Sequence, residues 1–138
     1  MALDANGHSG GLVLGTKDSN LKILNSWGSG SMLGVEVYSS DLCTNLTLIN
    51  LYGPCQDHIS FWNKLFTKSQ LNCPNLVIGG DLNVSLGIFE SWGPNAQVDP
   101  LVDFFLNKIR MGHIIDVDLI KETPTWRNRR VGEASGVK

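Results

Sequence analysis

The sequence predicts an α/β fold in which a mixed sheet carries covering helices. The first half of the 138 residues consists of short apolar stretches separated by Gly and Ser, a pattern typical of strands. Between residues 45 and 78, a strand-like stretch, an amphipathic stretch and a second strand-like stretch follow one another. Because this order commonly joins parallel neighbours of one sheet, we expect a mixed α/β or α+β architecture.

The predicted strands of the first half are marked by apolar runs and by the glycines between them. Residues 12–14 form an apolar stretch enclosed by glycines. Leu21 to Trp27 and Met32 to Tyr38 flank Gly28-Ser29-Gly30, which suits a hairpin turn because glycine tolerates positive φ. Asn45 to Tyr52 is the clearest strand, and its apolar residues alternate onto both faces, so we expect cover on both sides.

The remaining elements follow from helical spacing and from breakers. Residues 58–71 predict an amphipathic helix, after which 76–78 predict a short buried strand that Gly79-Gly80 ends. A second helix is expected to begin with Asp99 as N-cap and to end at Gly112, with a buried stripe of Leu101, Phe105 and Ile109. Residues 113–120 then read as a strand or strand-like segment.

Composition and charge limit the function classes. The formal charge is −2, so charge by itself does not indicate a nucleic-acid binder. Arg127, Arg129 and Arg130 nevertheless cluster near the C-terminus, either as a solvated loop or as a phosphate-contacting patch. No apolar run approaches the roughly 18 residues of a membrane span. Three cysteines without a C-x-x-C pair suggest reduced thiols in an intracellular compartment.

Two constellations at predicted strand ends could carry chemistry. In Gly79-Gly80-Asp81-Leu82-Asn83, an Asp can hold an attacking water or a hard cation, and an Asn carboxamide can orient that water or a phosphoryl oxygen. The alternative is an Asx-type turn in which Asp81 bonds nearby backbone amides. Tyr52 ends the preceding strand and could donate a hydrogen bond to a phosphate, or it could be a core tyrosine. If the strands are neighbours, Tyr52 and Asp81 leave the same edge of the sheet.

Four motifs occur in an order that resembles the endonuclease/exonuclease/phosphatase superfamily, which is deoxyribonuclease I-like in fold. They are SGGL (9–12), NLYGP (50–54), GGDLN (79–83) and TPTW (123–126). The FW pair in the first predicted helix and the PTWRN ending make the resemblance closest to the endonuclease domain of plant LINE-type retrotransposons. It covers essentially the whole chain and implies a partial two-sheet β-sandwich flanked by helices.

The resemblance also implies an activity, a cofactor and a partner. Its members hydrolyse phosphoester bonds with a divalent metal, usually magnesium, and DNA would be the partner of the intact domain. By position, Asp81 would activate or position the attacking water, Asn83 would support that water or the phosphate, and Tyr52 would contact the scissile phosphate. The implied substrate-binding residues are Trp126 on the rim and two phosphate contacts, Arg127 and Arg129.

Two parts of the family's site have no counterpart in these 138 residues, namely a metal-binding Glu before the SGGL region and a late Ser-Asp-His motif. We therefore expect residues 1–138 to be a single domain, incomplete at both ends, from a LINE-type endonuclease. We expect no principal metal ligand in it and no useful nuclease activity by itself, because in-line displacement needs the metal to neutralise charge on the leaving oxygen. The expected location is intracellular, and nuclear if the chain acts on chromosomal DNA.

Other functions remain open at this point. The chain could be a non-catalytic nucleic-acid-binding remnant that uses the arginine patch. It could belong to a phosphatase branch of the same superfamily, acting on inositol lipids or small phosphoesters. It could also fail to form a stable protein.

Overall fold

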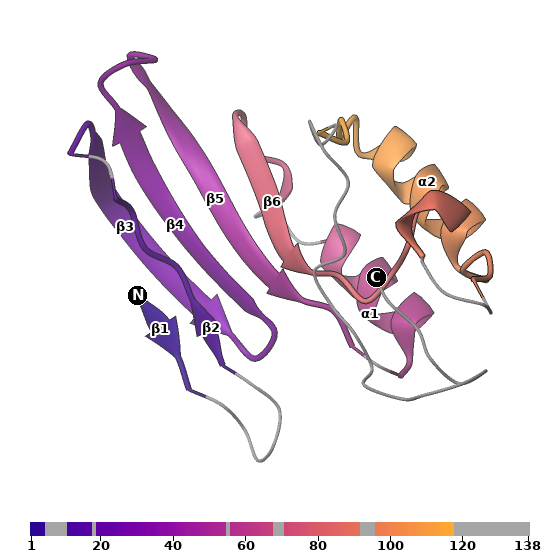
Figure 1. The fold of residues 1–138 in the computed structure, drawn as a ribbon. Helices are drawn as coiled ribbons and strands as arrows, with labels where there is room; N and C mark the ends of the chain where they lie inside the picture. Colours follow the sequence, from indigo (N-terminus) through magenta and orange to yellow (C-terminus); the bar gives the residue numbers. More distant parts are fainter. Residues whose placement is uncertain (5–10, 18, 55, 68–70, 92–95, 118–138) are drawn as a thin grey trace. The chain divides into compact units, whose positions relative to one another are not determined.

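The computed structural model confirms the α/β class and describes residues 1–4, 11–17, 19–54, 56–67, 71–91 and 96–117 (Figure 1). The chain divides into two compact units, Met1–Asn83 and Val84–Lys138. The first unit holds two sheets and one helix, and the second holds a short 3₁₀ helix and one α-helix. The elements are β1 (Ala2–Leu3), β2 (Leu12–Val13), β3 (Leu21–Ser29), β4 (Met32–Ser39), β5 (Thr44–Tyr52), α1 (His58–Phe66), β6 (Leu76–Asp81), η2 (Ile88–Glu90) and α2 (Val102–Met111).

The larger sheet has the strand order β3-β4-β5-β6. Strands β3, β4 and β5 pair antiparallel through short turns, whereas β5 and β6 pair parallel and are joined by the segment that contains α1. The predicted strand–helix–strand unit is therefore confirmed. Among the described residues, β6 pairs with β5 on one side only.

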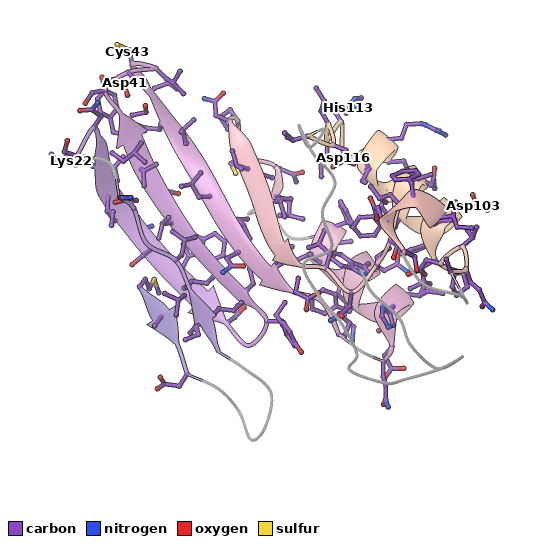
Figure 2. The ribbon with its side chains drawn as sticks, in the orientation of Figure 1. Lys22, Asp41, Cys43, Asp103, His113 and Asp116 are labelled. Atoms are coloured by element: carbon purple, nitrogen blue, oxygen red, sulfur yellow. The ribbon has the colours of Figure 1, made fainter. Side chains whose placement is uncertain are left out.

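The two turns of this sheet are short. Ser29 pairs with Met32, so the first turn consists of Gly30 and Ser31, two residues later than the glycine pattern suggested. Gly30 has φ 47°, which a glycine adopts at little cost. At the other end of the hairpins, Asn20 donates from Nδ2 to the Asp41 carboxylate at 3.2 Å (Figure 2).

One face of the larger sheet packs with α1. Helix α1 buries Trp62 and Leu65, and Leu65 lines the same groove as Met32 of β4. Ile49 and Leu51 of β5 lie on the Met32 face and are buried. Each fully buried side chain of this kind stabilises the folded state by about 1.5–3 kcal/mol.

The small sheet β1–β2 packs on the opposite face. Leu3 lies against Gly28, where a Cβ would meet its side chain, and Asn50 of β5 donates from Nδ2 to the Val13 carbonyl at 3.1 Å. Beneath this sheet β4 buries Leu33, Val35 and Val37. Both faces of β5 therefore have cover, although the face with Leu46, Leu48, Asn50 and Tyr52 is only half-buried.

Three predicted boundaries in the helical segments were wrong. Helix α1 ends at Phe66, with Thr67 as its C-cap, and the Thr67 hydroxyl donates to the Lys64 carbonyl at 2.8 Å. Helix α2 begins at Val102, three residues after Asp99, whose Oδ1 accepts the Leu101 amide at 2.9 Å in the preceding turn. Residues 113–117 form no strand; no described segment pairs with them, and residues 118–120 lie outside the described part.

Strand β6 is bonded to β5 at both ends by asparagines with left-handed backbones. Asn75 (φ 54°) donates from Nδ2 to the Thr44 hydroxyl and to the Asn45 carbonyl, at 3.2 and 3.1 Å. Asn83 (φ 51°) donates from Nδ2 to the Gly53 carbonyl at 2.7 Å. Asparagine tolerates this conformation better than most residues, so one residue type supplies both the turn and the bond.

Of the two glycines in β6, only Gly80 is required by the backbone. It has φ 127°, and a Cβ there would meet the Leu51 carbonyl oxygen of the neighbouring strand. A Cβ on Gly79 would meet no atom within 4 Å. The Gly-Gly pair therefore brings β6 close to β5 through its second residue.

Replacing Gly80 by Ala is expected to lower the free energy of unfolding by more than about 2 kcal/mol, because the new methyl group meets backbone at a positive φ. Gly79→Ala is the matched control, and we expect it to change stability by less than about 0.5 kcal/mol. Urea unfolding followed by circular dichroism measures both variants. Equal losses in the two variants would contradict this assignment.

Replacing Asn83 by Gly removes the bond to the Gly53 carbonyl but keeps the left-handed backbone accessible. We expect a loss of about 1 kcal/mol, the usual net contribution of one such hydrogen bond. The exposed Asn72, changed to Gly, controls for the added chain flexibility. The same urea titration applies, and a variant at Asn83 that is no less stable than the Asn72 control would show that the bond contributes nothing.

Candidate active site at the carboxyl ends of β5 and β6

The structure brings Tyr52 and Asp81 together, as predicted for two neighbouring strands. They are register partners in the parallel pair β5–β6, each at the carboxyl end of its strand. Residues paired in this way carry their side chains on the same face of a sheet. Tyr52 is half-buried and Asp81 is exposed, so the pair combines a partly covered phenol with a carboxylate open to solvent.

The two motifs that contain these residues meet at Gly53. Its amide donates to the Asp81 carbonyl at 2.6 Å, which extends the ladder by one bond beyond the register pair. Gly53 is buried, and a Cβ there would meet the Leu82 carbonyl. The NLYGP and GGDLN motifs therefore form one junction, and glycine is the residue that fits between the two chains.

Asp81 and Asn83 bond within this junction as well as facing solvent. The Asn83 amide donates to Asp81 Oδ1 at 3.2 Å, which is the Asx-type turn considered from the sequence. The Asn83 side chain donates from Nδ2 to the Gly53 carbonyl. A role for Asn83 in holding water or phosphate therefore stays a prediction. Its Nδ2 already donates a hydrogen bond to the Gly53 carbonyl within the junction.

Two further residues on this face, Asn50 and Gly79, were assigned no part in the site's chemistry from the sequence. Asn50 of β5 lies one step back from Tyr52 on the same face and is the register partner of Gly79. Its side chain is bonded to Val13 of the small sheet, so it links that sheet to the site. Gly79 leaves the surface open beside it. Asn50 belongs to the quoted NLYGP motif, but its partner Val13 is remote in sequence and no local pattern indicates it.

The arrangement supplies one hydrogen-bond donor and one base on an exposed surface. The Tyr52 hydroxyl can donate to an anionic oxygen such as that of a phosphodiester. Asp81 Oδ1 accepts the Asn83 amide, which leaves the second carboxylate oxygen to accept from a bound water. These are the groups that a hydrolytic site uses to hold a phosphate and a nucleophile.

The described residues at this edge offer few ligands to a divalent metal. Magnesium takes six oxygen ligands and is commonly held by one or two carboxylates together with substrate phosphates. Asp81 is the one carboxylate at the junction, and the described residues contain no group of three or more His, Cys, Asp or Glu placed to hold a metal. The predicted absence of the family's principal Glu ligand concerns the sequence and is not tested by this geometry.

The predicted substrate contacts Trp126, Arg127 and Arg129 lie outside the described residues, as do Ser9 and Gly10 of the SGGL motif. Their predicted roles remain predictions. Within the described ranges, neither helix is long and apolar enough to cross a membrane.

Comparison with known proteins identifies the fold. The structure is similar to the solved endonuclease domain of TRAS1, a telomere-specific non-LTR retrotransposon, with a TM-score of 0.64 and 15% sequence identity. The match covers 99% of this chain and 64% of the other, so this chain spans less than two thirds of that domain's length. No family model and no curated protein matches the sequence. The described residues therefore share the α/β fold of this solved domain.

Proposed function

We propose that this chain is part of a DNA phosphodiesterase domain from a LINE-type retrotransposon, a magnesium-dependent endonuclease in its intact form. The observation that carries the proposal is the pairing of Tyr52 with Asp81 at the carboxyl edge of β5–β6, in a chain with the fold of an endonuclease domain. Ligands of α/β folds commonly bind at the carboxyl ends of the strands. The four sequence motifs, in order, support the same family.

In this proposal the chain supplies half of a hydrolytic site. Tyr52 donates to an oxygen of the scissile phosphate, and Asp81 accepts the proton of the attacking water through the carboxylate oxygen that faces solvent. The Gly53 junction holds the two strand ends in register, so both groups face one substrate. Neither group stabilises the negative charge that develops on the leaving oxygen. Stabilisation of transition-state charge is usually the largest single contribution to lowering the activation barrier.

The isolated 138-residue chain is therefore expected to show no turnover that depends on Asp81. Nicking of supercoiled plasmid DNA in magnesium measures this, with Asp81→Ala and Tyr52→Phe as variants. We expect all three proteins to nick at the same background rate. Nicking by the wild-type chain that falls at least about tenfold in Asp81→Ala would overturn the view that the site is incomplete.

Two further readouts separate the alternatives. Release of phosphate from a small phosphomonoester, lost in Asp81→Ala while plasmid DNA is untouched, would favour a phosphatase. Salt-sensitive binding of duplex DNA that is unchanged in Asp81→Ala, but weakened by replacing Arg127 and Arg129 with Ala, would favour a non-catalytic nucleic-acid-binding remnant. Binding that is instead weakened by Tyr52→Phe supports substrate contact at the β5–β6 edge.

A further inference from the structure

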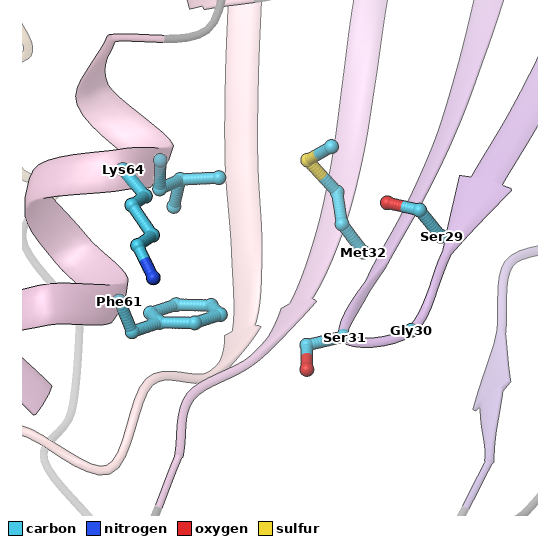
Figure 3. Close-up of a pocket in the computed structure, with 7 residues that line it drawn as sticks. Ser29, Gly30, Ser31, Met32, Phe61 and Lys64 are labelled. Atoms are coloured by element: carbon cyan, nitrogen blue, oxygen red, sulfur yellow. The ribbon is translucent and has the colours of Figure 1, made fainter. Parts of the chain in front are cut away.

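A groove lies where the β3–β4 turn faces α1, and none of its described lining residues belongs to the candidate active site. It has a volume of about 310 Å³ and opens to solvent (Figure 3). Its described lining residues come from two short segments of the first unit, the turn and residues 61–65 of α1: Ser29, Gly30, Ser31, Met32, Phe61, Lys64 and Leu65. A groove of this size accommodates a small organic molecule rather than a macromolecule.

The groove has an apolar floor and a polar rim. Met32 and Leu65 are each 4% exposed and form the floor. Phe61 is half-buried and adds the edge of an aromatic wall. The rim carries the ammonium group of Lys64 and the hydroxyl groups of Ser29 and Ser31, and Lys64 is the one charged residue among the described lining residues. The two kinds of surface are thus segregated, as a ligand with a polar head and an apolar body requires.

One wall of the groove is fixed by backbone bonds. The Tyr52 amide donates to the Ser31 carbonyl at 2.9 Å, and Ser29 pairs with Met32 across the turn. Gly30 occupies the position that needs positive φ. The turn is therefore held in place without a ligand, which reduces the entropy lost on binding.

We propose that this groove binds a small monocarboxylate with an apolar body, such as an arylalkanoate. The carboxylate contacts Lys64 and the serine hydroxyls, and the body covers Met32, Phe61 and Leu65. The single cation among the described lining residues matches one negative charge, whereas a phosphate dianion would keep half of its charge unpaired. A wholly apolar ligand would desolvate the ammonium group without replacing its hydrogen bonds.

This site is separate from the proposed phosphodiesterase edge. Met32 pairs with Leu51, whose side chain lies on the opposite face of β5 from that of Tyr52. Occupation of the groove can therefore be tested without reference to nuclease activity, and the failure of one proposal leaves the other standing.

Titration of the ¹⁵N-labelled full chain with 4-phenylbutanoate tests the proposal. We expect backbone amide shifts at Gly30, Ser31 and residues 61–65 of α1. Lys64→Gln is expected to raise the dissociation constant about three- to fivefold, within the range of an exposed ion pair. Lys22→Gln is the matched control, because Lys22 lies at the far end of β3 from the turn and should leave binding unchanged (Figure 2).

A second pair of variants tests the apolar side. Phe61→Ser should weaken binding, whereas Ile59→Ser on the same helix, at a 52% exposed residue outside the lining, should not. The dispersion of each spectrum confirms that the variant folds. Four results would each overturn the proposal. Uncharged 4-phenylbutan-1-ol could bind as tightly as 4-phenylbutanoate, or thymidine 5′-monophosphate could bind more tightly than it. Lys64→Gln could leave the affinity unchanged, or the amide shifts could be confined to residues outside the groove.

Discussion

The geometry of the candidate site depends on how the carboxyl ends of β5 and β6 are held together. Parallel strands lack a tight turn that would fix their register, so the register must come from packing and from specific bonds. Here Gly53 uses both of its backbone groups, donating to the Asp81 carbonyl and accepting from the Asn83 side chain. Because these bonds place Tyr52 beside Asp81, a shift of one residue along either strand would separate the phenol from the carboxylate.

The same alternation of side chains gives the sheet two surfaces with different uses. Odd positions of β5 such as Leu51 face the layer that contains α1, where buried apolar side chains stabilise the fold. Even positions such as Asn50 and Tyr52 face the small β1–β2 sheet and the junction. A single strand therefore connects a packed interior, a ligand-sized groove and a polar edge, and the backbone bond between Tyr52 and Ser31 joins two of these regions directly.

Periodicity in the sequence predicted the elements better than their ends or their partners. The strand–helix–strand unit, the hairpin and the pairing of Tyr52 with Asp81 follow from alternation, from helical spacing and from the glycines, all of which are local signals. Helix α1 ends at Phe66, within the stretch whose helical spacing continues to residue 71. Strand β1 has two residues and is defined only by its pairing with β2. The left-handed conformations of Asn75 and Asn83 likewise depend on acceptors far away in sequence, which no local pattern reveals.

The composition of β6 has a consequence for pairing between molecules. This strand reads LVIGGD, pairs with β5 on one side among the described residues, and leaves the Val77 side chain 52% exposed. An apolar strand edge with unpaired amides and carbonyls is a template for intermolecular β-pairing. The acidic residue of β6, Asp81, opposes such pairing by its charge and is also the residue that the proposed chemistry requires.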